Sequence, residues 1–251
     1  MAVRRSAFGQ RLRAWYRRNA RDLPWRRTRD PYHILVSELM LQQTQVSRVM
    51  DFYDRFLKRF PTLDHLAAAR PKQVREQWEG LGYYARARNL HALSRLVTRD
   101  GASTYNGALP SEPAELRKLP GIGAYTAGAV ASFAHGKRAA LVDTNVARVL
   151  ARVFAPSLNP KRGRDLKQLW QIAERTLPRT AAATWTHNQA LMELGALVCT
   201  ARVARCGNCP VSSVCMSRRV GDGRRRPADG GGQERPKNER RAPSWADSSR
   251  K

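Results

Sequence analysis

The chain has 251 residues, 42% of them hydrophobic, and a formal net charge of +26. This length can hold one large domain or two small ones with a sizeable core. An isoelectric point near 11.3 indicates a nucleic-acid partner; a basic ribosome-associated protein or a solvated charged surface is the alternative. No apolar run approaches the roughly 20 residues of a membrane span, and no secretory leader opens the sequence. We therefore expect a reducing compartment.

The predicted elements are helices separated by short breaks. Residues 1–18 are basic and amphipathic, and their pattern continues directly into the domain, which argues against a transit peptide. Between residues 31 and 60 apolar residues recur at helical spacing, at Ile34, Leu35, Leu39, Val46, Val49, Phe52 and Phe56. Proline and glycine divide the rest into helices of ordinary length, and strand-like alternation is rare. The sequence predicts an all-α fold.

Glu38 is the odd residue on an apolar helix face. It lies four positions after Ile34 and three after Leu35, and so points to the same side. Burial of a carboxyl there would raise its pKa and favour the protonated form, which can act as a general acid near neutral pH. The alternative is a buried glutamate whose hydrogen bonds are satisfied by a helix terminus.

A glycine hairpin, Leu119-Pro120-Gly121-Ile122-Gly123, precedes a helix predicted over 124–134. Its N–H groups can point outward, and the start of the next helix adds partial positive charge. We expect Gly121 and Gly123 to bind a phosphate without reading a base. An ordinary helix–helix connection is the alternative.

Asp143 follows the apolar Leu141 and Val142 and precedes a helix predicted from about Asn145. The apolar face of that helix is Val146, Val149, Leu150 and Val153. An aspartate at this position caps the helix, and the helix dipole favours its charged form. One carboxyl pushed toward neutral and one held anionic is the pairing that breaks a glycosidic bond, since the acid protonates the leaving group and the anion stabilises the sugar cation.

The chain has four cysteines, Cys199, Cys206, Cys209 and Cys215, with six, two and five residues between them. Such a group can enclose one metal centre. Spacing alone leaves zinc and an iron–sulfur cluster as equal candidates, and disulfides are less favoured. The loop between the first two cysteines carries Arg202 and Arg205, which would project toward phosphate from a pinned loop; solubility is the alternative.

After Cys215 the composition changes. Residues 216–251 hold eleven basic and five acidic residues, a net charge of +6, with few apolar residues. We expect this basic tail to remain disordered, because it cannot bury enough surface to fold. The other +20 belongs to residues 1–215.

From about Leu23 to Cys215 the chain resembles the helix-hairpin-helix DNA glycosylases, and within them the adenine-specific mismatch (MutY-like) branch. The resemblance is carried by residues 23–26, 37–46, 80–91, 119–123 and 142–146. The segments most specific to the adenine branch are Gln42-Gln43-Thr44 and Gly82-Tyr83-Tyr84. The hairpin and the cysteines are shared more widely, including with endonuclease III-like enzymes. The six-two-five cysteine spacing is that of the family's [4Fe-4S] cluster, so the resemblance decides for iron over zinc.

The resemblance implies a two-lobed, all-α fold with the active site in the cleft and a C-terminal iron–sulfur cluster loop. One lobe would be a six-helix unit over about 30–137 that includes the hairpin. The other would combine residues 1–29 with 138–215, and residues 216–251 would be the tail.

The same resemblance implies roles for individual residues. Glu38 matches the general acid, which protonates adenine at N7, and Asp143 matches the carboxylate that stabilises the cationic sugar. Gln43 and Tyr83 match residues that enter the base stack, and Gln42 belongs to the same motif. Arg26 and Gln189 match positions around the extruded adenine.

Tyr125 stands where lyase-competent relatives carry a lysine, and a tyrosine cannot form a Schiff base. In family members with this tyrosine it is placed to hydrogen-bond near the reaction centre; packing against the hairpin is the alternative.

Two features depart from the adenine branch. A polar tail stands where that branch carries a domain that reads 8-oxoguanine, and Thr144 stands where it commonly has glycine.

The sequence thus predicts a monofunctional DNA glycosylase that removes adenine opposite guanine or 8-oxoguanine. A thymine or uracil mismatch glycosylase and a non-catalytic iron–sulfur DNA-binding protein remain the alternatives. We expect a monomer that binds double-stranded DNA and no membrane and, for a bacterial source, lies in the cytoplasm with the nucleoid.

Overall fold

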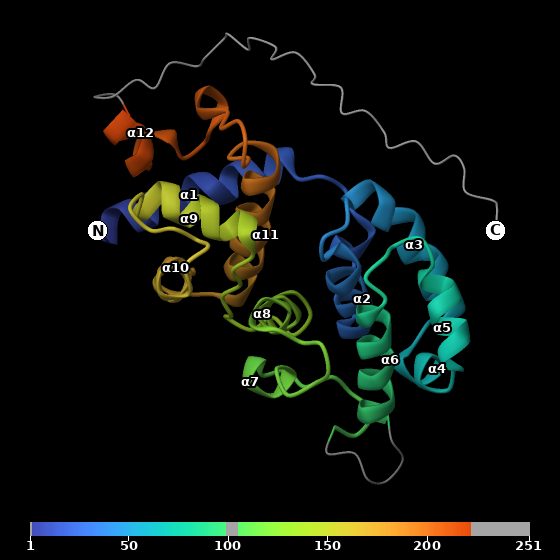
Figure 1. Cartoon of the computed structure of the whole chain (residues 1–251). Coiled ribbons are helices and arrows are strands. Elements are labelled where there is room, and N and C mark those ends of the chain that lie inside the picture. Colours follow the sequence, from blue (N-terminus) through green and yellow to red (C-terminus); the bar gives the residue numbers. More distant parts are fainter. Residues whose placement is uncertain (1, 99–104, 222–251) are drawn as a thin grey trace, which may run out of the picture.

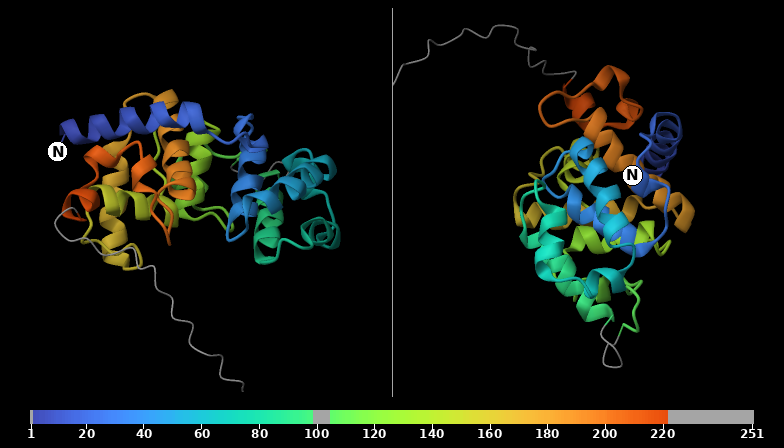
Figure 2. Two further views of the ribbon diagram at one scale, coloured as in Figure 1. Left: turned by 90° about the horizontal axis from the view of Figure 1, so that it is seen from above. Right: turned by 90° about the vertical axis from the view of Figure 1, so that its right-hand side faces the viewer.

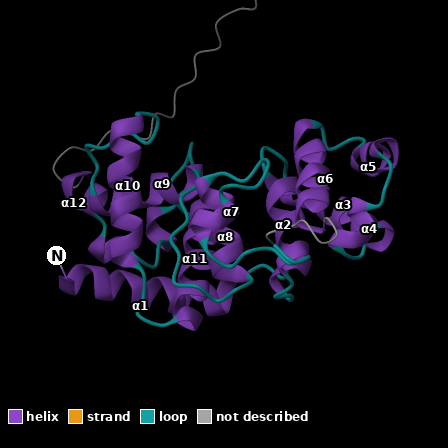
Figure 3. Cartoon of the chain, turned by 90° about the horizontal axis from the view of Figure 1, so that it is seen from below, coloured by secondary structure: helices purple, strands orange, loops and turns teal. Residues whose placement is uncertain are grey.

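The computed structural model describes residues 2–98 and 105–221, and within them the chain is helical (Figure 3). The described residues contain one isolated bridge, between Cys199 and Ala204, and no strand. The predicted all-α class is confirmed. The helices are α1 (Ala2–Asn19), η1 (Pro24–Arg26), α2 (Pro31–Leu41), α3 (Val46–Arg59), α4 (Leu63–Ala67), α5 (Pro71–Trp78), α6 (Ala85–Thr98), α7 (Pro113–Leu116), α8 (Ala124–Phe133), α9 (Thr144–Phe154), α10 (Gly163–Thr176), α11 (Ala181–Leu197), η2 (Cys206–Asn208), η3 (Ser212–Val214) and α12 (Met216–Gly221).

Two groups of helices lie side by side (Figures 1 and 2). Helices α3 to α6 form one group, with α2 on its inner side, and α1, α9, α10 and α11 form the other. Helix α8 lies between them and packs against both α2 and α11. Helix α1 also packs against α11, so segments from opposite ends of the chain build one group.

Apolar faces at helical spacing explain this packing. Helix α1 buries Phe8, Leu12 and Tyr16, each four residues after the last. The apolar face predicted for α9 is confirmed, because all four of its residues are 2% exposed or less. These faces join a hydrophobic core that runs through both groups of helices. No helix among the described residues has the length and apolar character needed to cross a membrane.

The helical spacing of residues 31–60 runs across a break that the pattern did not predict. Helix α2 ends at Leu41 and α3 begins at Val46. Gln43, in the connection, has a backbone φ of 56°, a left-handed conformation that non-glycine residues seldom adopt. The contacts that hold this conformation belong to the site described below.

The basic tail needs one correction. Residues 216–251 were expected to lack structure, but Met216–Gly221 form the short helix α12, which packs against α9. This packing joins segments that lie more than 60 residues apart, so local composition does not reveal it. The rest of the predicted tail lies outside the described residues.

Candidate active site

Helix α2 carries Glu38 into the interior. Asp30 caps the helix by accepting hydrogen bonds from the backbone N–H groups of Tyr32 and His33. Because α2 packs against α3, α6 and α8, it is buried on nearly every side, and Glu38 is 4% exposed. Its Oε2 has no hydrogen-bond partner in the described structure. Burial, the largest influence, raises the pKa of Glu38 to about 7, while a hydrogen bond from Tyr125 acts to lower it. The predicted desolvation of this carboxyl is confirmed.

Asp143 caps helix α9, as the sequence predicted. Its Oδ1 accepts a 2.6 Å hydrogen bond from the backbone N–H of Val146, and its Oδ2 accepts one of 3.2 Å from the side chain of Asn145. From the sequence, only the helix cap could be inferred, and a cap favours the charged form of Asp143. Burial has the larger effect and raises the pKa of Asp143, while the hydrogen bonds from Val146 and Asn145 oppose the rise.

One cavity of about 730 Å³ joins the two carboxyls. It is bounded by η1, α2, the first turns of α8 and α9, and the middle of α11. The cavity brings together seven residues predicted for the site: Arg26, Glu38, Gln42, Gln43, Tyr125, Asp143 and Gln189. Thr144 lines it as well, directly beside Asp143.

Tyr125 lies between the carboxyls and α11. Burial raises the pKa of its hydroxyl well above the usual value, and the charges of Glu38 and Asp143 raise it further. The hydroxyl also lies 3.2 Å from the sulfur of Met192, so its single proton has two possible acceptors, that sulfur and the Glu38 carboxyl. Tyr125 therefore stays a neutral hydrogen-bond donor at the carboxyl of Glu38.

The same cavity is also lined by an ion-paired group that the sequence did not predict. Glu193, fully buried on α11, accepts bonds of 2.8 Å from Nε and Nη2 of Arg21 and from Nη2 of Arg26. Burial alone would raise the pKa of Glu193, but the hydrogen bonds from the two arginines outweigh it and lower the pKa to about 2. The spacing of Gln189 and Glu193, four residues apart on one helix, was the signal that could have revealed it.

Arg26 also fixes the side chain of Gln189. Its Nε donates a 2.9 Å hydrogen bond to the Gln189 side-chain oxygen, and its Nη1 donates to the backbone carbonyl of Arg21. Since the amide oxygen is taken, the amide nitrogen of Gln189 is left as the donor toward the cavity.

Arg86 is the second residue that sequence reasoning missed. It is 7% exposed, yet its guanidinium donates only to backbone carbonyls and to the Thr44 hydroxyl. The carbonyls belong to Leu39, Met40, Gln42, Leu81 and Gly82. Arg86 thereby joins the end of α2 to the turn over residues 80–83, which we call the Tyr83 turn. No sequence pattern distinguished it from its neighbour Arg88.

Tyr83 projects from this turn. It has a φ of 47° and is 61% exposed, although it is aromatic. The Arg86 guanidinium lies 5.5 Å from the ring centroids of both Tyr83 and Trp78. Tyr83 lines a shallow cavity of about 380 Å³ with Gln42 and Gln43. The residues predicted to enter a base stack are therefore neighbours in space, and two of them have left-handed backbones.

The hairpin connects α7 to α8 and lies apart from the residues that line the 730 Å³ cavity. Gly121 has a φ of 77°, and a Cβ there would lie 2.7 Å from the Cβ of Asn89, so only glycine fits. Gly123 is the N-cap of α8, and a Cβ there would meet open space. The start of α8 thus has free space beside Gly123, and the first N–H groups of a helix have no partner within it.

All four cysteines are free thiols and line one cavity of about 620 Å³. Arg202 and Arg205, the predicted phosphate ligands, line it too. Nη1 of Arg152 donates to the sulfur of Cys199 at 3.4 Å and to the carbonyl of Thr200 at 2.8 Å. Among the described residues, no three His, Cys, Asp or Glu side chains are placed to hold a single metal ion.

Fold and cavity together define an all-helical protein in which a helix–hairpin–helix element accompanies a cleft with two buried carboxyls. The family model for "HhH-GPD superfamily base excision DNA repair protein" matches residues 36–175. The chain belongs to this superfamily, and the resemblance drawn from the sequence is confirmed.

Comparison with individual proteins gives similarities that are more specific than the superfamily. Adenine DNA glycosylase of Rattus norvegicus is 42% identical over 87% of this chain and 43% of its own length. That of Mycolicibacterium smegmatis is 46% identical over 84% of this chain and 69% of its own. A solved thermostable thymine-DNA glycosylase is 31% identical, covers 87% of this chain and 98% of its own, and superposes with a TM-score of 0.78. The chain spans about two fifths of the length of the rat relative.

Proposed function

We propose that the chain is a monofunctional DNA glycosylase of base excision repair that hydrolyses the N-glycosidic bond of adenine mispaired with 8-oxoguanine or guanine. The observation that carries the proposal is the shared cavity of Glu38 and Asp143, whose carboxyls have different surroundings. Glu38 has an oxygen with no partner, whereas both oxygens of Asp143 accept hydrogen bonds. The identity with adenine DNA glycosylases supports adenine as the base.

In this mechanism Glu38 donates its proton to N7 of the extruded adenine, which makes the base a better leaving group. A pKa of about 7 supports the role, since a large fraction of the carboxyl is then protonated at neutral pH. Asp143 faces the sugar as an anion and stabilises its positive charge until water attacks. Tyr125 hydrogen-bonds the Glu38 carboxyl and supplies no amine, so strand cleavage through a Schiff base is not expected.

The other wall would receive the base. Arg26 holds the oxygen of Gln189, so that the amide nitrogen can donate to a ring nitrogen of adenine. Gln43 and Tyr83 would occupy the space in the base stack, with Gln42 beside them. Gly121, Gly123 and the start of α8, together with Arg202 and Arg205, would bind phosphates of duplex DNA.

We also propose that Cys199, Cys206, Cys209 and Cys215 hold a [4Fe-4S] cluster. Four unpaired thiols around one cavity are the donor set such a cluster needs. The cluster would tie the loop that carries Arg202 and Arg205 to the fold. Purified protein should be brown and contain iron; colourless protein with zinc would contradict this assignment. We expect the protein to act as a monomer and, for a bacterial source, to lie in the cytoplasm on nucleoid DNA.

One experiment tests the activity. Four duplexes carry A opposite 8-oxoguanine, A opposite G, T opposite G, and U opposite G, and abasic sites are scored after incubation with cluster-loaded protein. Release of adenine alone supports the proposal. Release of pyrimidine alone would favour the second candidate, a thymine or uracil mismatch glycosylase. Thr144 in the cavity and the likeness to the thymine-DNA glycosylase are the observations behind that candidate. No release from any duplex would favour a non-catalytic DNA-binding protein.

A further inference from the structure

A basic cavity of about 500 Å³ lies between the first two turns of α5 and those of α6, apart from the cleft of Glu38 and Asp143. Its charged lining residues are Lys72, Arg75 and Arg88, and no carboxylate lines it. Within the described part of the chain, none of these three cations forms an ion pair. Like charges around one cavity repel one another, so a bound anion would relieve the repulsion.

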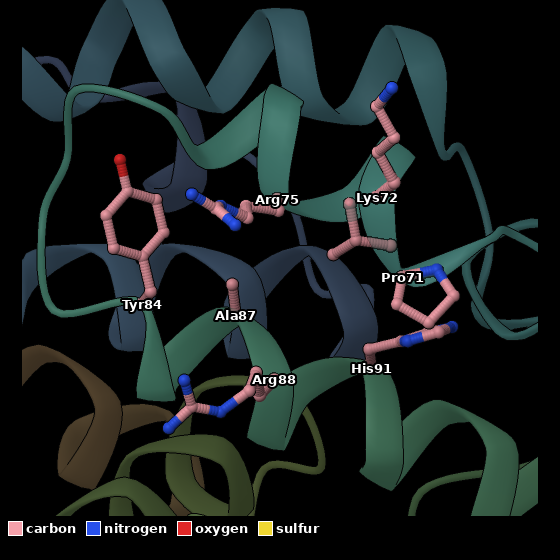
Figure 4. Close-up of a pocket in the computed structure, with 8 residues that line it drawn as sticks. Pro71, Lys72, Arg75, Tyr84, Ala87, Arg88 and His91 are labelled. Carbon is pink, nitrogen blue, oxygen red and sulfur yellow. The ribbon is translucent and has the colours of Figure 1, made fainter.

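One of the three cations lies over an aromatic ring of the cavity. The Arg75 guanidinium lies 5.6 Å from the centroid of the Tyr84 ring. In Figure 4, Arg88 extends from α6 on the side of the cavity where Tyr84 and Arg75 lie, below the backbone of Tyr84, whereas Lys72 extends away on the other side. Two planar guanidinium groups from different helices can donate several hydrogen bonds to the oxygens of one phosphate.

His91 lines the same cavity and has an unsatisfied polar atom. The residue is 7% exposed, and its Nε2 is buried without a hydrogen-bond partner. Burial lowers the pKa of His91, which keeps the ring neutral, so Nε2 accepts hydrogen bonds while the ring bonds to the backbone of Ala69. In Figure 4 the His91 ring points toward Pro71, so its unsatisfied nitrogen lies at the end of the cavity away from Arg75 and Arg88.

The basic cavity continues the surface on which Tyr83 stands. Tyr84 and Arg88 line it and also line the shallow cavity of Gln42, Gln43 and Tyr83. A DNA strand whose stack is entered by Tyr83 has its next phosphates only about 3.4 Å further along the duplex axis. We propose that Arg75 and Arg88 bind one backbone phosphate of duplex DNA next to the Tyr83 turn. This inference rests on the proposed function, because it takes DNA as the ligand.

The test removes the positive charges of Arg75 and Arg88 and compares this double variant with a control double variant. Arg75→Gln with Arg88→Gln changes two exposed side chains, and Lys167→Gln with Arg175→Gln removes the same charge from exposed positions on α10. Both pairs are made in a Glu38→Gln chain, which leaves the substrate intact. The Arg75/Arg88 pair should reduce the slope of log K against log salt by about 1, equally for mismatched and fully paired duplexes. The α10 pair should change the slope by less than half as much.

Single uncharged methylphosphonates then locate the contact. One position near the mismatch should weaken binding of the parent chain about tenfold, the usual scale for a charge-assisted hydrogen bond, and should not affect the Arg75/Arg88 variant. If no position shows this dependence, or if both variant pairs lose the same affinity, the site does not exist. Arg75-dependent binding of free inorganic phosphate without the DNA dependence would overturn the assignment to DNA. Because binding is read in an excision-deficient chain, absence of glycosylase activity would leave this result unchanged.

Discussion

The two walls of the cleft hold buried arginines in opposite ways. In the wall built by η1 and α11, Arg26 pairs with the Glu193 carboxylate at 2.8 Å. Behind the α2 wall, where α6 packs against α2, Arg86 donates only to carbonyl and hydroxyl oxygens. The first arrangement neutralises charge and orients the side chain of Gln189. The second leaves its charge without a carboxylate and fixes the backbone of the segments that carry Gln43 and Tyr83. One wall is therefore organised for side-chain contacts with a base, and the other for the placement of a turn.

The largest expected effect is the loss of excision when the general acid Glu38, in the α2 wall, is changed. Glu38→Gln preserves the shape of the α2 wall but removes its proton donor. We expect the single-turnover excision rate to fall about 10²- to 10⁴-fold, the usual contribution of general acid catalysis. Duplex affinity should stay within about twofold of the parent, because glutamine keeps the shape of the glutamate side chain and lacks only its acidic proton. Unchanged excision would remove Glu38 from the mechanism.

Glu193→Gln tests the charge-paired wall. The variant leaves Arg26 buried without its carboxylate, and we expect the free energy of unfolding to drop by about 3 kcal/mol, because an uncompensated buried charge is costly. Urea denaturation measures the change. Glu174→Gln, at an exposed position on α10, is the control and should be neutral. Equal stability of the two variants would mean that the ion-paired group is dispensable.

Arg86→Met tests the wall held through its backbone. Carbonyls at the end of α2 and in the Tyr83 turn lose their donor, which should cost about 2 kcal/mol of stability. Arg86→Lys keeps the charge without the planar fork. If Arg86 is a positioning residue, the lysine variant should lose more in kcat than in duplex affinity. Arg95→Met, exposed on the same helix, provides the control. Equal losses in kcat and affinity would argue for a purely structural role.

The pH profile sharpens the contrast between Glu38 and the opposite wall. Glu38 must be protonated to act, so excision should fall about tenfold per pH unit once the pH rises above its pKa of about 7. Tyr125→Phe removes the hydrogen bond that lowers this pKa, so the fall should begin at higher pH. Glu193, with a pKa of about 2, should contribute no step above pH 5. A profile unchanged by Tyr125→Phe would contradict the assignment of Glu38 as the titrating acid.

The smallest expected effect is on stability and concerns His187, a buried histidine on α11. Neither of its nitrogens has a partner in the described structure, and burial, its main influence, lowers its pKa to about 3. Below pH 6.5 the unfolded chain takes up a proton at His187 that the folded chain refuses, so stability is lost as the pH falls toward 3. His187→Leu should gain about 1 kcal/mol at pH 7, and more at pH 5. Urea midpoints at both values measure the difference; an equal gain at both would exclude the titration.

The sequence by itself determined the helical class, the apolar faces and the two carboxyls. Glu38 stood out because a charged residue on an apolar face must be desolvated, and Asp143 because helix starts have local chemistry. The hairpin glycines and the cysteine spacing are also local patterns, and they could be read without a fold.

Only the tertiary structure decided which residues share the cavity. Glu193 reaches Arg21 across 172 residues of chain, and Arg86 reaches the carbonyls of α2 from more than 40 residues away. The left-handed turn at Gln43 and the burial that raises the pKa of Asp143 depend on the same long-range packing. Helical periodicity tells which face of a helix is apolar, but not which other helix covers it. Hydrogen bonds and desolvation are set by that partner.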